Sequence, residues 1–233
     1  TVNRQIRESL ARGEKEIVLK DVLGQRYIAG GVRGDARFTV HGTPGQDLGA
    51  FMNGPEVIIY GNAQDGTGNT MNAGRIVVHG KAGEIPGHSM RGGTIMIRDD
   101  VEYRAGIHMK EYKSKLPVLV IGGTAQDFCG EYMAGGVLIL LGLGLDNGQR
   151  HRAKYIGTGM HGGVIYLRGE VDDYQLGKEV GIAIPDENDY DVLRKHVADY
   201  VACFGGDVEA ILAGSFKKLY PKSLRPYGRL YAY

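Results

Sequence analysis

The sequence predicts an all-β fold, a single-stranded right-handed parallel β-helix of about seven coils with short N- and C-terminal helices. The first observation behind this prediction is a motif of Gly, two variable residues and Met that returns at fixed intervals. Its clearest copies begin at Gly49, Gly68, Gly87 and Gly106, so that successive copies are nineteen positions apart. Looser copies begin at positions 130 and 157. A constant period of this length indicates stacked, equivalent structural units.

Apolar pairs are the second observation. In each pair one residue separates two apolar residues, and the pair occurs once per repeat just before a strand-ending residue that is usually glycine. The seven pairs are Phe38/Val40, Val57/Ile59, Ile76/Val78, Ile95/Ile97, Val118/Val120, Leu138/Leu140 and Ile165/Leu167. Such alternation predicts short strands whose inward side chains stack from coil to coil. Only the copy that begins at Gly106 is stretched, with sixteen positions instead of twelve between its glycine and the strand end.

The third observation is the content of 38 glycines. Tight corners need backbone with positive φ and close approach of stacked chains, which glycine allows without strain. A repeat of this length is too short for a unit of two helices, but it suffices for one turn of a β-solenoid whose coils are about 4.8 Å apart. We therefore place the repeats in residues 30–170.

The two ends of the chain are expected to close the solenoid, because open ends would expose strand edges and core. In residues 1–29, Ile6 and Leu10 lie four apart and predict a short capping helix over residues 2–12, followed by an irregular lead-in. In residues 171–233, an apolar stripe predicts a helix over residues 189–204 with Asn188 or Asp189 as its N-cap. A shorter helix over 207–212 and an extended tail rich in Lys, Arg and Tyr follow and pack on the solenoid.

Composition limits the classes of partner. The formal net charge of +1 gives no electrostatic footprint for nucleic acid or a membrane surface, and we expect neither as a partner. No apolar run is long enough to span a membrane and the start lacks a signal-peptide pattern, so the expected location is the cytoplasm. Cys129 and Cys203 show neither a metal-site spacing nor a disulfide framework.

The outer strand face changes in character along the stack. In the early coils Arg37, Glu56 and Arg75 occupy equivalent outward positions, which predicts a solvated column of alternating charge. In the later coils the outward positions become apolar, and such a surface is normally covered. Either the chain's own tail or a protein partner could cover it, and both remain open. The residues predicted to dock a partner are Leu119, Ile121, Ile139, Leu141 and Tyr166.

No catalytic, cofactor-binding or metal-binding residues are predicted. Asp65 and Asp127 precede their motif glycines by three residues and are expected to cap turns through hydrogen bonds to the backbone. An alternative groove-binding β-helix enzyme would use them together with His161. The glycine-rich run at residues 141–148 resembles a dinucleotide fingerprint but lacks the helix that a true fingerprint opens. A hexapeptide-repeat acyltransferase is disfavoured because the apolar residues do not recur every six positions.

Several motifs resemble a known family. They are Gly49-Ala50-Phe51-Met52, Gly66-Thr67-Gly68-Asn69, Gly130-Glu131-Tyr132-Met133-Ala134-Gly135-Gly136 and Gly157-Thr158-Gly159-Met160-His161-Gly162-Gly163. Together they resemble the glycine-motif β-helix domain at the C-terminus of the glutamate synthase large subunit. An accessory component of formylmethanofuran dehydrogenase is similar to that domain.

The resemblance implies a non-catalytic scaffold subunit, without a cofactor of its own, in a glutamate-synthase-like oxidoreductase of nitrogen metabolism. In that family the glutaminase, FMN and iron–sulfur chemistry lies in other domains, so the expected partners are glutaminase-like and FMN-domain protein subunits. An accessory subunit of a formylmethanofuran-dehydrogenase-like enzyme is the alternative from the same resemblance. The sequence also leaves homo-oligomerisation through the apolar outer strip open.

Overall fold

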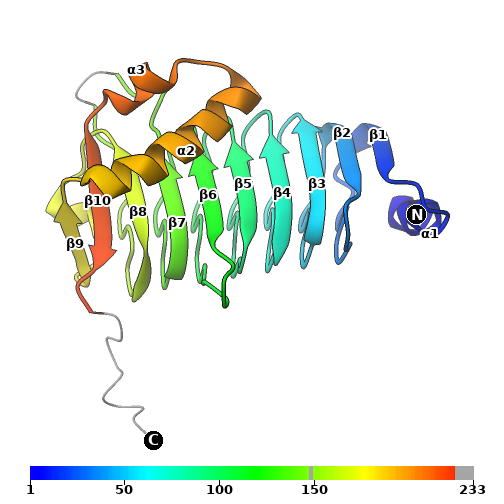
Figure 1. Cartoon of the computed structure of the whole chain (residues 1–233), viewed down its shortest axis with the longest axis horizontal. Coiled ribbons are helices and arrows are strands. Elements are labelled where there is room, and N and C mark those ends of the chain that lie inside the picture. The colour runs from blue at the N-terminus through cyan, green and yellow to red at the C-terminus, as the bar shows by residue number, and fades with distance from the viewer. Residues whose placement is uncertain (147–148, 224–233) are drawn as a thin grey trace, which may run out of the picture.

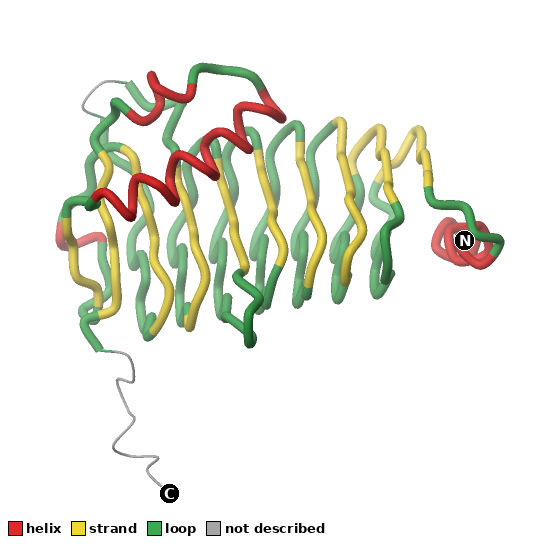
Figure 2. Tube along the Cα trace, viewed as in Figure 1, coloured by secondary structure: helices red, strands yellow, loops and turns green. Residues whose placement is uncertain are grey.

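A computed structural model describes residues 1–146 and 149–223 of the chain. The end of the glycine-rich run at 141–148 and the last part of the basic tail therefore lie outside the described residues. Figures 1 and 2 show a long sheet built of stacked coils, with helices at one end and on one face. The elements are α1 (Val2–Ala11), β1 (Glu16–Leu23), β2 (Arg37–Thr43), β3 (Asn53–Tyr60), β4 (Ala73–Val78), β5 (Gly93–Ile97), β6 (Pro117–Ile121), β7 (Ala134–Leu140), β8 (Gly162–Arg168), η1 (Asp173–Gln175), β9 (Val180–Ala183), α2 (Glu187–Phe204), α3 (Val208–Leu212) and β10 (Phe216–Pro221).

Strands β1 to β8 pair in parallel and in chain order, as a β-solenoid requires. Val57, Ile76 and Ile95 are direct neighbours in this ladder and are fully buried, so the inward side chains stack as the apolar pairs predicted. The solenoid has about six turns. The predicted number of seven coils was slightly too high, because it counted the seven strands β2 to β8 instead of the six turns that join them.

The motif glycines belong to turns in which the backbone amides alternate in direction. Gly66, Gly68 and Thr70 all have positive φ, at 71°, 71° and 54°. Gly68 donates its N–H to the preceding coil (Leu48), whereas Gly66 and Thr70 donate to the following coil (Glu84 and His88). A Cβ atom on Gly68 would lie only 2.3 Å from Ile95 Cδ1. The motif therefore needs glycine both for its φ and for the room it leaves in the core.

The motif methionines form a buried column inside the solenoid. All six are completely inaccessible to solvent: Met52, Met71, Met90, Met109, Met133 and Met160. Unbranched, polarisable methionine fills irregular space between stacked turns well. This column explains why Met recurs with the same period as the glycine.

Strand β6 corrects the predicted register of the outer face. Leu119 pairs with Ile95 and Ile121 with Ile97, and both lie in the solenoid core, while Val118 and Val120 point outward. The cause is an insertion in the loop 110–116, which makes the spacing from Ile95 to Leu119 five positions longer than the spacing from Ile76 to Ile95. Because strand side chains alternate between faces, a shift of one residue exchanges the inner and outer sets.

The C-terminal segment covers the outer face of the later coils. In Figure 1, α2 crosses in front of β8, β7, β6 and β5. Leu193, Val197 and Tyr200 of α2 are at most 2% exposed. They form a second apolar core with the outward residues Met96, Val118, Val120, Val137, Ile139, Leu141 and Tyr166 and with Ile211, Leu212 and Phe216. The chain's own tail, and not a partner, therefore covers this face.

Helix α2 begins earlier than predicted. Its N-cap is Asp186, whose side chain accepts the Asp189 N–H, and the Asp189 side chain in turn accepts the Asp186 N–H. This reciprocal capping box places Asp189 one turn inside the helix, not at its cap. The helix ends at Gly205, whose φ of 82° breaks the helical backbone.

The two ends of the sheet are built differently. At the N-terminal end, α1 buries Ile6 against the core, and the segment predicted as an irregular lead-in contains the regular strand β1 with a register shift between Leu19 and Val22. At the other end, β10 pairs antiparallel with β8, and β9 pairs antiparallel with β10 as the last strand.

Candidate partner-docking surface

The five residues predicted to dock a partner are all buried within the chain. Leu119 and Ile121 face the interior of the solenoid, which corrects their predicted outward orientation. Ile139, Leu141 and Tyr166 face outward as predicted, but they lie in the core shared with α2. A surface for a partner must therefore be sought on the part of the outer face that α2 leaves bare.

Tyr166 belongs to a buried polar cluster that connects β8, α2 and β10. Its hydroxyl donates to Asp189 Oδ1 at 2.6 Å, and Lys218 Nζ lies 2.7 Å from the same oxygen. Burial alone would raise the pKa of Asp189, but the hydrogen bonds from Lys218 and Tyr166 outweigh it and hold the pKa below its ordinary value. Burial and the bond to Asp189 raise the pKa of Tyr166. These contacts fasten α2 to the sheet.

The three residues of the predicted groove do not come together. Asp65 and Asp127 accept backbone amides of the following coil, from Glu84 at 3.0 Å and Lys154 at 2.8 Å. They lie in one column but three coils apart, about 14 Å at the usual strand spacing. His161 is engaged within its own turn, where Nδ1 lies 3.2 Å from Gly159 O. The aspartates cap backbone as predicted, although they bond to the next coil and not to their own turn.

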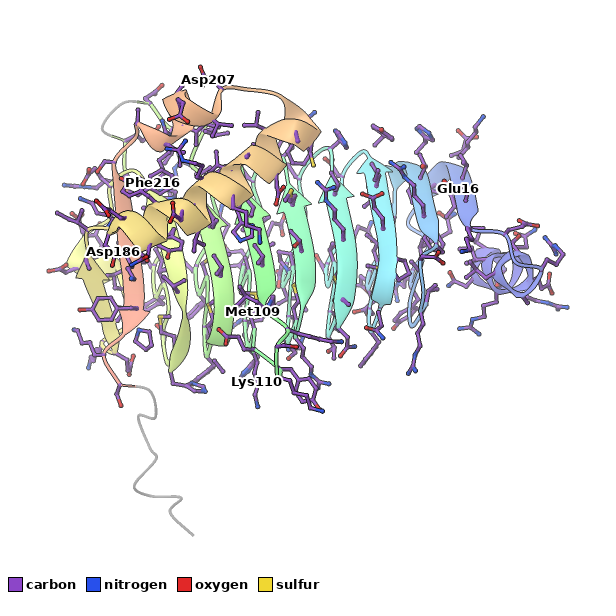
Figure 3. All side chains as sticks on the ribbon, in the orientation of Figure 1. Glu16, Met109, Lys110, Asp186, Asp207 and Phe216 are labelled. Carbon is purple, nitrogen blue, oxygen red and sulfur yellow. The ribbon has the colours of Figure 1, made fainter. Side chains whose placement is uncertain are left out.

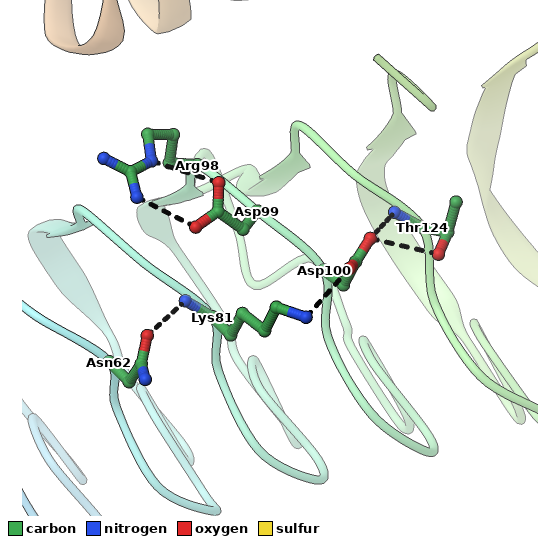
Figure 4. Close-up of polar contacts among 6 residues, drawn as sticks. All are labelled: Asn62, Lys81, Arg98, Asp99, Asp100 and Thr124. Atoms are coloured by element: carbon green, nitrogen blue, oxygen red, sulfur yellow. Dashed lines mark hydrogen bonds and ion pairs between the residues drawn. The ribbon is translucent and has the colours of Figure 1, made fainter. Parts of the chain in front are cut away.

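Neighbouring corners use the same kind of contact, as Figure 4 shows. Asn62 Oδ1 accepts the Lys81 N–H at 2.9 Å, and Asp100 Oδ1 accepts the Thr124 N–H at 2.9 Å. Burial would raise the pKa of Asp100, but Thr124 and Lys81 outweigh it and the pKa is lowered. Polar residues at these corners therefore join one coil to the next.

The outward residues of β1 to β4, which we call the N-terminal outer face, carry the predicted charged column. Glu56 Oε2 lies 3.2 Å from Arg37 Nε, and its Oε1 lies 3.5 Å from Arg75 Nη1. The column of alternating charge is thus confirmed. Arg75 also donates to Cys203 Sγ at the end of α2, so the column begins where the helix stops.

An aromatic ladder runs beside this column at the ends of the same strands. The rings of His41 and Tyr60 stack with centroids 5.2 Å apart, and those of Tyr60 and His79 with centroids 4.7 Å apart. Phe204 of α2 meets His79 edge-on at 5.0 Å. Tyr60 is 49% exposed and Val18 on β1 is 56% exposed. This face therefore offers aromatic, apolar and charged groups to a partner.

The loop 110–116 is a second exposed feature. Every residue of this loop is exposed, and it carries three lysines and one glutamate. Its tip is a tight bridge between Tyr112 and Lys115, and Lys113 Nζ lies 5.4 Å from the Tyr112 ring centroid. Figure 3 labels its start, Met109 and Lys110, at the rim of the solenoid opposite α3.

A third exposed feature, aromatic stacking on the turns, was missed from the sequence. His108 stacks on Tyr132 at 5.3 Å and Phe128 on Tyr155 at 4.9 Å, with the Arg104 guanidinium 5.2 Å from the Phe128 ring. A signal was present, because His108 and Tyr132 both stand two residues after a motif glycine, and Phe128 and Tyr155 both stand two before one.

Burial shifts the pKa of two buried titratable side chains towards their neutral forms. Burial raises the pKa of the Cys129 thiol to about 12, so that it stays neutral. Burial lowers the pKa of His151, and its Nε2 lies 2.9 Å from Arg168 O. Across residues 1–146 and 149–223 no three His, Cys, Asp or Glu side chains gather as metal ligands, and no helix is long and apolar enough to span a membrane.

The fold and this surface define a class: a glycine-motif parallel β-solenoid with a helix-covered half and a bare half of its outer face. The GXGXG motif family matches residues 14–225, and the chain belongs to that family, which includes the glycine-motif domain of glutamate synthase. The chain is also similar to an uncharacterized protein of Methanocaldococcus jannaschii. The two are 51% identical over 239 residues, which cover 99% of this chain and 91% of that protein.

Proposed function

We propose that this chain is a non-catalytic scaffold subunit of a glutamate-synthase-like oxidoreductase complex in the cytoplasm. Its role is to hold a glutaminase-like chain and an FMN and iron–sulfur chain in fixed relative positions. Membership of the GXGXG motif family supports this proposal. The observation that carries the proposal is the N-terminal outer face. There an ion column and an aromatic ladder lie partly exposed beside α2, which covers the outer face over β5 to β8.

The N-terminal outer face has the composition of a protein-binding surface. Tyrosine and arginine are the residues that most often dominate binding energy at interfaces, while charges at the rim favour the correct partner. Tyr60 lies between two histidine rings, so its side chain loses little conformational freedom on binding. A partner that docks here would also touch the end of α2 through Phe204.

A rigid solenoid can hold bound partner chains at fixed positions. From β2 to β8 the coils span about 29 Å at about 4.8 Å per step, and every step is joined by a parallel ladder. Polar corners such as Asp65 and Asp127 add bonds between coils. Partners bound at different coils would therefore keep a fixed separation.

Co-expression with the glutaminase-like and FMN-domain chains of the same host tests the proposal. We expect a stable complex that contains all three chains in native mass spectrometry. The variant Tyr60→Asp should weaken capture of at least one partner about tenfold or more, because it places a charge at the centre of the aromatic ladder. The matched control is Tyr103→Asp, a tyrosine 42% exposed on a turn. Recovery of this chain alone in the presence of both partners would contradict the proposal.

A further inference from the structure

Strand β9 is the last strand of the ten-stranded sheet, and its outer edge has no neighbour among the described residues. In Figure 1 it lies at the end of the molecule farthest from α1. Residues 180–184 contain no charged residue and no proline. By contrast, β1 at the other end carries Glu16, Lys20 and Asp21 and a register shift, features that protect edges from pairing. Of the two edge strands of this sheet, β9 carries neither a charged side chain nor a register shift, although its length of four residues limits a partner strand to a few hydrogen bonds.

The pairing with β10 determines which backbone groups of β9 remain free. Lys222 donates its N–H to Glu179 O at 2.7 Å, which places Glu179 among the residues that bond to β10. Since these residues alternate in an antiparallel ladder, Gly181 and Ala183 also face β10, while Ile182 directs its N–H and C=O groups to the free edge. Ile184 directly follows β9, and a partner strand that extends β9 by one residue would use its N–H and C=O groups in the same way.

Val180 also faces the free edge, but its N–H is already donated to Gly177 O at 3.0 Å. The free set therefore contains the N–H groups of Ile182 and Ile184 and the carbonyl of Val180, together with their own carbonyls. This set fits a strand that runs antiparallel through the same three residues.

We propose that the β9 edge pairs with the β9 edge of a second copy of this chain, about a two-fold axis at Ile182. In this register Ile182 faces Ile182 of the second copy, and each exchanges its N–H and C=O with the other. Ile184 N–H donates to the Val180 carbonyl of the second copy. By the two-fold symmetry, Ile184 N–H of the second copy donates to the Val180 carbonyl of the first. The Val180 N–H, which is not available, is the one donor that this register leaves unused.

Charge complementarity favours the same register. Lys178 lies just before β9 and Asp186 just after it, and both side chains are exposed in the single chain. An antiparallel pair centred on Ile182 brings Lys178 of one copy to the same end of the paired segment as Asp186 of the other. Opposite charges across an antiparallel pair stabilise it, whereas like charges oppose it. A shift of two residues would lose both this charge match and the match of free backbone groups.

The apolar side chains at this end would be buried by the pairing. Ile184 is 84% exposed, the highest value among the large apolar residues described, and Ile182 is 38% exposed. A cavity of about 660 Å³ adjoins Ile182, and Tyr174 and Leu176 also line it. The second copy would cover this cavity, so the C-terminal end of one solenoid closes the end of the other.

The oligomeric state of the full chain tests the pairing. Light scattering on a sizing column at tens of micromolar should give twice the chain mass of 25.3 kDa. Ile182→Lys places two like charges on the axis and should yield monomer, because it weakens the dimer at least tenfold. Val18→Lys is the matched control, since Val18 is an exposed apolar residue on β1 at the opposite end of the sheet. It should leave the dimer unchanged.

Hydrogen exchange on the unaltered chain gives a second measurement that does not depend on a variant folding. The amides of Ile182 and Ile184 should be protected at high concentration and should exchange at least tenfold faster after dilution to monomer. Ile184→Pro, which removes one free donor from a largely exposed residue, should weaken the dimer in the same direction.

Each other occupant of the edge gives a distinct result. A full chain that is monomeric, with dimer only in a chain ended at Ser223, would assign the edge to the chain's own last residues and overturn the proposal. Protection of Ile182 only after addition of a partner chain would assign it to that partner's strand. A dimer that persists in Ile182→Lys with an unprotected position 182 in the unaltered chain would place the contact elsewhere. Both of the last two results would also overturn the proposal.

Discussion

The outer face of one continuous sheet has two different surroundings. Over β5 to β8 it is apolar and lies beneath α2, where Val120 and Ile139 are fully buried. Over β1 to β3 it carries Arg37 and Glu56 of the charged column and is open to solvent, while at β4 the end of α2 meets Arg75 and the outward Val77 is already buried. The backbone ladder is the same in both halves, so the outward side chains alone decide whether a strand is covered. The comparison shows that the inner core builds the solenoid and the outer face determines what binds to it.

The largest expected effect comes from a charge placed beneath the helix. Val197→Asp buries an unpaired carboxylate in the core between α2 and the sheet, and we expect a loss of about 3–5 kcal/mol in the free energy of unfolding. Urea denaturation followed by circular dichroism would measure it. Val18→Asp on the bare half should change stability by no more than about 0.5 kcal/mol. Equal losses from the two variants would remove the distinction between the halves.

A matched pair of truncations sharpens the comparison. Ile139 and Ile58 occupy outward positions on β7 and β3, but Ile139 is fully buried and Ile58 only partly so. Ile139→Ala should cost about 2–5 kcal/mol, because it removes packing and leaves a cavity. Ile58→Ala should cost clearly less, about 1 kcal/mol, in the same denaturation experiment. A larger loss at Ile58 would contradict the assignment of the bare half.

Acid should act on the covered half through Asp189. Its pKa is lower in the folded chain than in the unfolded chain, so its contribution is present above the unfolded value of about 3.9 and is lost as pH falls through the folded value. Lys218→Met removes the ammonium that lowers this pKa. The stability difference between the original chain and this variant, measured by denaturation from pH 7 to pH 3, should therefore shrink below about pH 4. If the stability difference stayed constant with pH, Lys218 would not act through the pKa of Asp189.

The smallest effect is expected in the charged column. Glu56→Gln removes the central charge of a partly exposed ion column, for which we expect a loss of about 0.2–1 kcal/mol that diminishes in high salt. Denaturation at low and high ionic strength would measure it. The same variant is expected to affect partner capture more than folding, as a docking surface would require.

The repeats could be predicted from the sequence because every turn requires the same residue types at the same positions. Gly68 must have positive φ and no Cβ, and Met71 must fill the core beside it, so both are visible as a period. The phase of β6 was not predictable in this way. All five residues of that strand are apolar and buried, so alternation could not show that Leu119, and not Val118, faces inward after the insertion.

The surface was less accessible to prediction than the core. The sequence showed an apolar outer strip and two possible covers for it, but only the packing of Leu193 and Val197 identifies α2 as the cover. Strand β9 was missed because four residues without alternating polarity give no strand signal. Asp65 and Asp127 were correctly expected to accept backbone amides, yet their partners are set by the stacking of coils and not by local sequence.

The alternating amides of the glycine turns constrain how such a chain can change in length. Since Gly68 bonds backward and Thr70 bonds forward, removal of one complete repeat leaves the flanking turns with donors and acceptors that still match. Loss of two or three residues inside a turn would instead leave amides without acceptors on both sides. The loop 110–116 obeys this constraint, because it begins directly after Met109 and leaves the turn before it intact. Natural variation in solenoids of this kind should therefore come in whole repeats or in excursions that leave the glycine turns intact. The loop 110–116 after Met109 is one such excursion, and the eight extra residues between β7 and Gly157 are another.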